Sequence, residues 1–539
     1  MPGLYIQIIS SLKTAYRFLR VLIVSLKWLA FIFILSRGIV FAQDVEDIFP
    51  SIKTPEQNEK PAIPPPAPEK GGQDRIEKPA APPSPLLNRL LEKISDDLTW
   101  GGYLRNETAF RYVSPTGFDK ILNILHLEGR YRLAPKVQLA GRLRAFYDAV
   151  YDVESIDVIS PRKGPDTILV DNVTEPDQVS GLDPNNVRDV HIVKSRIELK
   201  ELYLDINFQN FDLRIGRQIV RWGVVEGARV TDEINPLDFY ELILRDIDDR
   251  YIPLFMIKGD LYLGSNTFEG IIIPEVRGHR PAPKGTEWEQ FRLLPNLEKP
   301  EQPYEDFPNN IDNTEIALKY TRVFSGFELS ASYFYTWDDF PSSFRSIAGS
   351  GEFALAPTVD FVPKYNRLHI YGTTYSKTFS GFVFNAEAAY VDGKVFGARF
   401  GDGLSVQQGE IQKNYVKYAI GFDLYILGMD VSPAAIQQYI IDYDQNIIQD
   451  KVDTVGAVFI RKEFIHNLWT GNLLVLYFFN DEDWLIRPRT FYNITDRLRV
   501  SFGVDIFEGK IGTGLPGEFH FVGFFDNNDR IFWDITYSF

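Results

Sequence analysis

The chain has 539 residues, no cysteine and a formal net charge of −16 at pH 7. The lack of cysteine excludes disulfides, thiolate metal sites and a lipidated N-terminal cysteine, and the acidic balance argues against nucleic acid as a partner. Aromatic residues make up 14% of the chain, a high share for an acidic secreted globule but one that suits a protein with aromatic girdles at a membrane interface.

Residues 1–42 have the three parts of an export signal peptide. Positive charges come first, the apolar core Trp28–Leu35 follows, and Val40 and Ala42 supply the small residues that a signal peptidase reads. The alternative is an uncleaved anchor. Because Lys27 and Arg37 interrupt the apolar run, it is shorter than the roughly 20 residues that a spanning helix needs. We therefore expect cleavage after Ala42.

Residues 43–85 form a Pro-rich segment that we predict to be a disordered periplasmic linker. Runs such as PAIPPPAPEK and EKPAAPPSP carry almost no aromatic residues, and such a composition cannot bury enough apolar surface to fold. The linker is either a passive tether or an arm that docks a periplasmic or inner-membrane transporter. Residues 86–97 then predict a short amphipathic helix, which could plug the periplasmic mouth, touch a partner or pack on a barrel rim.

From residue 98 to 539 the apolar residues recur with a period of two. Residues 121–133, 137–147, 415–427 and 498–507 each alternate apolar side chains with charged or small ones. In a soluble sandwich the polar face would be solvated, whereas in a membrane barrel it would line a lumen. We predict an all-β, transmembrane, antiparallel up-and-down barrel of about 16–18 strands, with an inward-folded loop.

The C-terminal IFWDITYSF favours the membrane barrel over a half-buried strand of a soluble protein. Ile535, Tyr537 and Phe539 share one face and end the chain on a Phe, which resembles the signal by which the barrel-assembly machinery inserts outer-membrane barrels. The expected location is the outer membrane of a Gram-negative bacterium, with membrane lipid and lipopolysaccharide as surroundings.

The stretch GRQIVRWGVVEGARVTDEINPLDF (Gly216–Phe239) begins as a strand and then fills with charge. An arginine facing hydrocarbon at the bilayer midplane costs roughly 2–4 kcal/mol, so we expect the chain to turn inward after Gly216 and residues 223–253 to constrict the lumen. A solvated outer loop is the alternative. The predicted constriction residues are Arg217, Arg221, Trp222, Arg229, Asp232, Asp238, Arg245, Asp249 and Arg250.

A second set of charges lies on the polar faces of the first three predicted strands. An arginine ladder opposite acids would impose a transverse field on the lumen, or the same groups could simply pair to stabilise the wall. The members are Arg105, Arg130, Arg132, Arg142, Arg144, Glu107 and Glu128.

Two blocks of the sequence resemble the domain of unknown function 1302 family of Gram-negative outer-membrane proteins. The matching residues are Gly216, Arg217, Gln218, Trp222, Gly223, Asn235, Pro236 and Asp238 in the first block, and Asp526, Asn527, Asn528, Asp529, Tyr537, Ser538 and Phe539 in the second. The resemblance implies a barrel over about 98–539 and an association with inner-membrane exporters of the resistance-nodulation-division type, which handle lipids and hydrophobic compounds. The Pro-rich segment departs from the family.

No enzymatic site stands out. No spacing between a histidine and a serine stands out on one strand face, no acidic stretch has the ligand spacing of a calcium loop, and we predict no metal and no cofactor. The favoured function is an outer-membrane channel or transport barrel for a small or hydrophobic substrate. The alternatives are the outer-membrane partner of an exporter and, more distantly, a sealed structural barrel or a barrel lipid hydrolase.

Overall fold

The computed structural model describes residues 97–155, 158, 169–170, 190–283, 286–289, 311–348, 358–398, 410–466, 468–510 and 520–539. The expected signal peptide, the Pro-rich linker and all but Asp97 of the expected helix lie outside these residues. None of the helices that the structure describes is long and apolar enough to cross a membrane.

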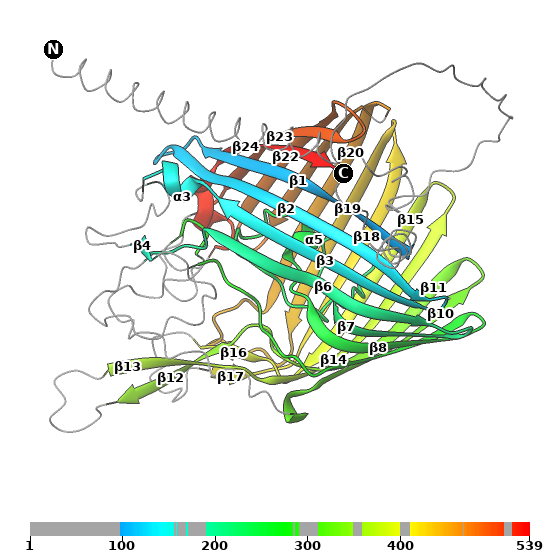
Figure 1. The fold of residues 1–539 in the computed structure, drawn as a ribbon. Coiled ribbons are helices and arrows are strands. Elements are labelled where there is room, and N and C mark those ends of the chain that lie inside the picture. Colours follow the sequence, from blue (N-terminus) through cyan, green and yellow to red (C-terminus); the bar gives the residue numbers. More distant parts are fainter. Residues whose placement is uncertain are drawn as a thin grey trace, which may run out of the picture.

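Eighteen strands form one closed antiparallel sheet (Figure 1). Each strand pairs with its neighbours along the chain, and β1 pairs with β24 to close the barrel, which confirms the predicted up-and-down barrel at the upper end of its strand range. The strands are β1 (Leu98–Arg111), β2 (Gly117–Ala134), β3 (Val137–Asp148), β6 (Ser195–Asn207), β7 (Phe211–Gln218), β8 (Leu254–Leu263), β9 (Asn266–Ile273), β10 (Glu315–Phe324), β11 (Phe327–Trp337), β14 (Arg367–Phe379), β15 (Phe382–Asp392), β18 (Tyr415–Ile426), β19 (Met429–Ile440), β20 (Val452–Ile465), β21 (Trp469–Phe478), β22 (Asp483–Asn493), β23 (Leu498–Glu508) and β24 (Arg530–Ser538).

The two ends of the barrel differ. One end has short turns, such as those at 135–136, 264–265 and 427–428, and the other has long connections. Since barrels of this kind keep short turns on the periplasmic side, the long connections mark the outer end. Small elements lie on these connections: the pairs β12 (Ser342–Ala348)–β13 (Thr358–Lys364), β16 (Val395–Gly397)–β17 (Glu410–Gln412) and β4 (Leu169–Val170)–β5 (Val190–His191), and the short helices α3 (Val150–Val153), α5 (Ile247–Arg250), η2 (Ile311–Asn313) and η4 (Gly523–Asn528).

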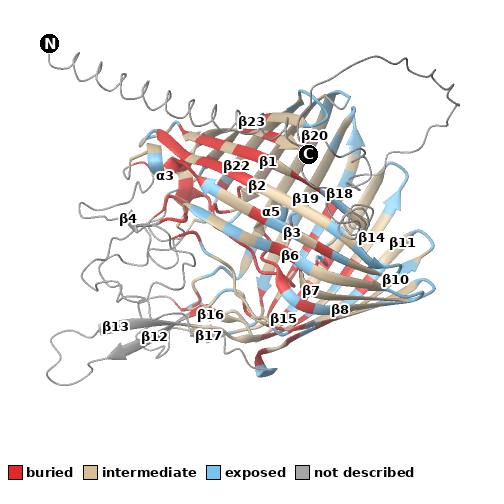
Figure 2. Cartoon of the chain, viewed as in Figure 1, coloured by how far each residue is buried: buried red, intermediate tan, exposed pale blue. Residues whose placement is uncertain are grey.

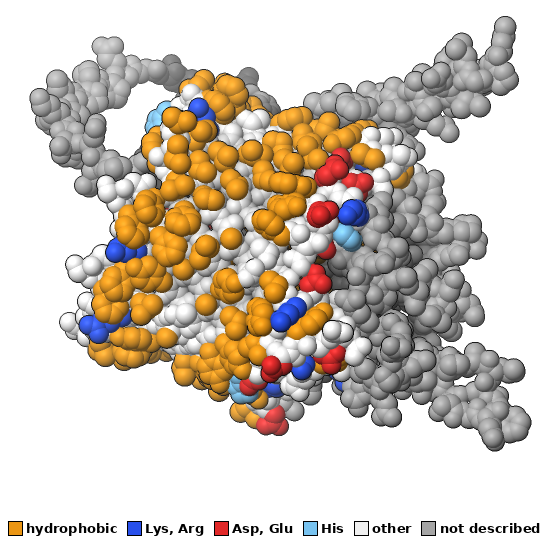
Figure 3. All heavy atoms as spheres, turned by 180° about the vertical axis from the view of Figure 1, so that it is seen from behind, with side chains coloured by type: hydrophobic (Ala, Val, Ile, Leu, Met, Phe, Trp, Pro, Cys, Tyr) orange, Lys and Arg blue, Asp and Glu red, His pale blue; other side chains and the backbone are white. Residues whose placement is uncertain are grey.

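The outside of the barrel is apolar. Side chains such as Leu139, Leu143, Tyr418, Ile420 and Phe502 face outward and are exposed. Figure 3 shows hydrophobic side chains over most of one outer face, with acidic side chains gathered towards one side and a few lysines and arginines at the margins. Closure of the sheet gives each strand two neighbours, so that ladder hydrogen bonds are made within the barrel, as the hydrocarbon interior of a bilayer demands. This barrel is a protein of the outer membrane.

The core lies inside the barrel. Between β7 and β8 the chain leaves the wall, and residues 219–253 fold into the lumen instead of forming an outer loop. In Figure 2 buried residues concentrate towards the end with the long connections, while the short turns are exposed. Two buried apolar clusters carry most of this contact, one on each side of the inward segment.

Candidate functional site

The inward segment, residues 219–253, is the candidate functional element, and Asn235 holds its two ends together. The Asn235 side chain accepts a hydrogen bond from the Val220 backbone N–H at 2.8 Å and donates to the carbonyl oxygens of Gln218 at 3.3 Å and Ile252 at 2.9 Å. It is fully buried. A single amide therefore satisfies three backbone groups at the point where the chain leaves and rejoins the wall.

The first half of the inward segment packs on the wall from β8 to β19. Trp222 donates its indole N–H to Glu269 of β9 at 2.7 Å, and Glu387 of β15 accepts hydrogen bonds from Val225 N–H at 3.2 Å and from the Thr231 hydroxyl at 2.6 Å. Around these polar contacts lie buried apolar residues of the segment and the wall, among them Val220, Val230, Ile234, Met256, Ile271, Ala317, Ala389 and Ala419.

The second half of the inward segment reaches the opposite wall. Leu242 and Leu244 pack in a cluster with Leu485, Phe507 and Phe525 of β22, β23 and η4. The neighbouring Glu241 forms two ion pairs with the wall, at 2.8 Å from Lys120 of β2 and 2.7 Å from Arg530 of β24. The inward segment thus contacts both sides of the barrel and crosses the lumen.

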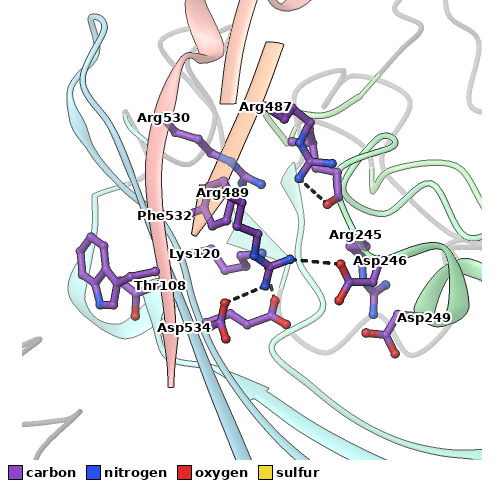
Figure 4. Close-up of a pocket in the computed structure, with 13 residues that line it drawn as sticks. Thr108, Lys120, Arg245, Asp246, Asp249, Arg487, Arg489, Arg530, Phe532 and Asp534 are labelled. Carbon is purple, nitrogen blue, oxygen red and sulfur yellow. Dashed lines mark hydrogen bonds and ion pairs between the residues drawn. The ribbon is translucent and has the colours of Figure 1, made fainter. Parts of the chain in front are cut away.

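A small charged cavity of about 30 Å³ remains between the inward segment and the wall of β1, β2, β22 and β24. A space of this size holds one or two water molecules. Figure 4 shows Arg489 pointing between Asp534 of the wall, at 2.7 Å, and Asp246 of the segment, at 3.2 Å. The charged residues of the lining are Lys120, Arg245, Arg487, Arg489 and Arg530 on the positive side, and Glu107, Asp246, Asp249 and Asp534 on the negative side.

Burial and neighbouring charges shift the pKa values of ionisable groups in the inward segment. Burial alone would raise the pKa of Glu241, but Lys120 and Arg530 outweigh it and lower that pKa. Burial likewise opposes the ionisation of Asp238, and Arg280 at 2.9 Å with Arg245 at 3.5 Å lowers its pKa. No carboxylate of the described residues forms an ion pair with Arg250, and burial, followed by Arg229, lowers its pKa to about 10.

The predicted constriction residues do not form one ring. Trp222 and Asp232 join each other through the Trp222 N–H, beside β9 and β10. Asp238 and Arg245 form an ion pair in the middle of the segment, and Asp249 lies 3.0 Å from Arg144 of β3. Inward folding is observed, while the role of each of these groups in a constriction stays a proposal.

The remaining arginines lie apart. Arg221 pairs with Asp248, and its guanidinium covers the Tyr251 ring at 4.5 Å. Arg229 donates to the Asn235 carbonyl at 3.0 Å and lies 3.6 Å from Glu233. Arg250 covers the Phe239 ring at 5.5 Å.

Arg217 differs from the prediction because it faces away from the lumen. It lies opposite Leu202 and Phe255, which are both more than 40% exposed on the outer face. Strand alternation continues through Gly216, so Arg217 follows Ile215 on the same side. Its charge is met by Glu275 at 3.1 Å, close to the outer end, where an outward arginine costs little.

The predicted ladder divides into a paired part and an exposed part. Arg105 lies 3.3 Å from Glu107 and 3.7 Å from Asp246, so it joins the wall to the inward segment. Arg142 lies 3.2 Å from Glu128 and 3.0 Å from Glu201, within the wall. Arg130 and Arg132 lie exposed towards the periplasmic end of β2. Pairing within the wall is therefore present at Arg142, while a transverse field from the ladder stays a prediction.

Sequence reasoning missed the strongest partners of the inward segment, which lie far away along the chain. Lys120, Arg487, Arg489, Arg530 and Asp534 all line the small cavity. The alternation of Arg487 and Arg489 in LIRPRTFYN was the available signal for a lumen face. Asn235 was recognised only as a family residue, because nothing local in the sequence indicates which backbone groups its amide would reach.

One group of described residues has the composition of a metal site: Asp481, Asp483 and His520, at the outer end of β22. Asp483 is fully buried and accepts a hydrogen bond from the Gly523 backbone N–H at 2.7 Å. It also lies 3.4 Å from His520 Nδ1. These contacts give the carboxylate a structural role in holding η4 against β22.

The C-terminal residues of the expected insertion signal complete the barrel seam. Ile535 lies opposite Asn106 and Tyr537 opposite Leu104 in the β1–β24 pairing. Phe539 exchanges two backbone hydrogen bonds of 3.0 Å with Gly102. Recognition of these residues by the assembly machinery stays a prediction.

Comparison with known proteins identifies a family. A family model described as "Protein of unknown function (DUF1302)" matches residues 116–445. No curated protein matches the chain.

Among solved structures, OccK8 (OprE) of Pseudomonas aeruginosa is 11% identical with a TM-score of 0.43, over 82% of this chain and 98% of that one. OccAB3 of Acinetobacter baumannii is 9% identical with a TM-score of 0.41, over 82% and 99%. A BenF-like porin from Pseudomonas fluorescens Pf-5 is 8% identical with a TM-score of 0.42, over 82% and 98%.

Proposed function

We propose that this chain, which belongs to the DUF1302 family, is a transport barrel that moves a small or hydrophobic substrate across the outer membrane. One observation carries the proposal: the inward segment crosses the lumen and is bonded to both walls, through Trp222 and Thr231 on one side and Glu241 and Asp249 on the other. A barrel that only scaffolds the membrane does not need a charged gate across its lumen.

The inward segment acts as the constriction. The small cavity beside its second half leaves space for little more than water, so a larger substrate passes at that point only when the segment moves. Cations and carboxylates face one another across this space, an arrangement that selects solutes by charge and size. The proposal assigns the chain no catalytic step and no cofactor.

Single-channel conductance in planar bilayers tests the proposal. We compare the wild type with a variant in which Gly227–Tyr251 is replaced by a short Gly-Ser linker. The expected result is small, charge-selective steps in the wild type that enlarge severalfold and lose selectivity in the variant, because the linker lacks Glu241, Arg245 and Asp249.

Two other results are informative. A silent wild type with a conducting variant would still support a gated barrel, closed by the segment at rest. Silence in both, with heat-modifiable mobility showing that both barrels are folded, would overturn the aqueous-pore proposal. As a control, a linker of the same kind in the exposed turn 494–497 should leave the conductance unchanged.

A further inference from the structure

The barrel wall is interrupted beside β6. β6 pairs with β3 from Ser195 to Ile206, but with β7 only from Leu202 onward. Ser195–Glu201 therefore has no strand partner on its β7 side in the described part of the chain, over about 20 Å at about 3.3 Å per residue. Along this edge the Leu199 carbonyl accepts a hydrogen bond from Arg217 Nε at 3.0 Å. The interruption follows from the inward segment, since the chain that would have extended β7 and β8 is inside the lumen.

This edge is bordered by a cavity of about 990 Å³ that touches both faces of β6. Ile197 and Leu199 line it from the outer, apolar face, and Arg196, Glu198 and Lys200 line it from the lumen face. Because successive side chains of a strand point to opposite sides, a cavity that meets both sets must pass around the strand edge. It joins the lumen to the outer face of the barrel.

The outer mouth of this cavity is apolar. Tyr147 and Leu199 are each more than 40% exposed there, and Ile197 is 76% exposed. Aromatic side chains at this level are typical of the girdle where the hydrocarbon meets the headgroups. Unpaired backbone at membrane depth is tolerated only where it lines a cavity or is covered, which describes the β6 edge.

The side of the cavity opposite β6 is basic. Arg217, Arg277 and Arg280 line the cavity there, together with the returning chain at Ile252 and Pro253. Arg217 and Arg277 share the single carboxylate of Glu275, at 3.1 Å and 2.7 Å. Arg280 shares Glu198 with Arg196 and also pairs with Asp238. Arg217 and Arg277 therefore share one carboxylate between two cations.

We infer that this cavity is a lateral passage between the lumen and the outer leaflet for a single-chain amphipathic anion. The apolar tail lies along Tyr147, Ile197 and Leu199, and the anionic head is held by Arg217 and Arg277. The inference rests on the proposed transport function and adds to it a substrate class and a sideways route.

The experiment uses a long-chain carboxylate that carries a diazirine in its tail, and the matching alcohol as a neutral probe. The full barrel is irradiated in nanodiscs, and mass spectrometry locates the label. We expect the carboxylate to label the peptide around Ile197, and the Arg217→Gln/Arg277→Gln variant to reduce this labelling roughly tenfold. The alcohol should label that peptide weakly in both proteins.

Closing the passage provides the second arm. The chain has no cysteine, so Ile197→Cys and Pro253→Cys, which both line the cavity, can be joined across it by a short bis-methanethiosulfonate, which forms reducible disulfides and releases sulfinate. The control pair is Leu204→Cys and Ile215→Cys, which lie opposite one another where β6 and β7 are paired. Joining the first pair should abolish labelling reversibly, and joining the control pair should not.

Potassium chloride conductance separates this inference from the proposed function. Loss of labelling on closing the passage, with unchanged conductance, supports a lateral passage in a working pore. A barrel that never conducts but is still labelled at Ile197 would reject the proposed aqueous pore and support the lateral passage. Labelling spread evenly over the outer face would overturn the inference. So would a membrane lipid, found by native mass spectrometry, that the carboxylate cannot displace, because that lipid would simply seal the wall.

Discussion

Asn235 has the most demanding position in the inward segment. Its amide is the partner of three buried backbone groups that belong to two separate stretches, at Gln218–Val220 and Ile252. The Asn-Pro pair fits this task, because Pro236 needs no donor of its own while its carbonyl accepts the Ile252 N–H at 2.8 Å. The Asn-Pro motif thus holds the two ends of the inward segment together.

We predict that Asn235→Ala releases the inward segment. Each buried backbone group that loses its partner costs about 1–3 kcal/mol. The measurement is trypsin cleavage of the folded barrel at Arg229, Arg245 or Arg250, which the lumen shields in the wild type, read by mass spectrometry. Asn446→Ala, on an exposed connection, is the control. Equal protection of both variants would mean that the apolar clusters alone hold the segment.

His279 also holds the inward segment in place, through a hydrogen bond that depends on the protonation state of its ring. Its Nδ1 accepts the Leu237 N–H at 2.8 Å, so the ring must be neutral at that nitrogen. Burial, and then Arg229 and Lys394, hold the pKa of His279 well below its usual value of 6.5. Asp339 lies 3.6 Å away, but burial raises the pKa of that carboxyl, which makes it a poor partner for an imidazolium.

Acidification should therefore loosen the inward segment. Because the folded pKa lies below the unfolded one, the stabilisation by neutral His279 is complete above about pH 6.5 and is lost as the pH falls from there towards the folded pKa. Single-channel records should show more frequent opening at about pH 5.5 than at about pH 7.5. His279→Gln keeps an acceptor but cannot titrate, so it should remove this dependence. If the Gln variant responds to pH as the wild type does, another group is responsible.

At the scale of elements, local sequence patterns predict where the strands lie but do not predict which residues their side chains contact. Alternation alone gave β2, β3, β18 and β23, because each strand must show one apolar face to lipid wherever it lies in the barrel. The break after Gly216 was visible for the same reason: the apolar series stops. The side of the strand on which Arg217 lies could not be predicted, because the sequence does not say whether the chain turns before or after that residue. In the structure the strand continues to Gln218.

The candidate site depends on contacts between distant strands. Glu241 meets Lys120 and Arg530, and no local rule pairs residues so far apart along the chain. A charge on a predicted lumen face could be assigned to the lumen but not to a partner, because the depth to which residues 219–253 descend is set by the apolar clusters on both walls. Those clusters form only once all the strands are in register.

At the scale of the whole molecule, every group of the proposed constriction lies between residues 98 and 539, so we expect the Pro-rich segment 43–85 to be a tether. Its deletion should leave both conductance and cellular transport of a hydrophobic compound unchanged, while heat-modifiable mobility shows an intact barrel. Replacing the segment with Gly-Ser residues of equal length separates spacing from sequence. If cellular transport is lost in both variants while the isolated barrel still conducts normally, the segment docks a transporter through its own sequence, because a spacer of the same reach would have served a tether.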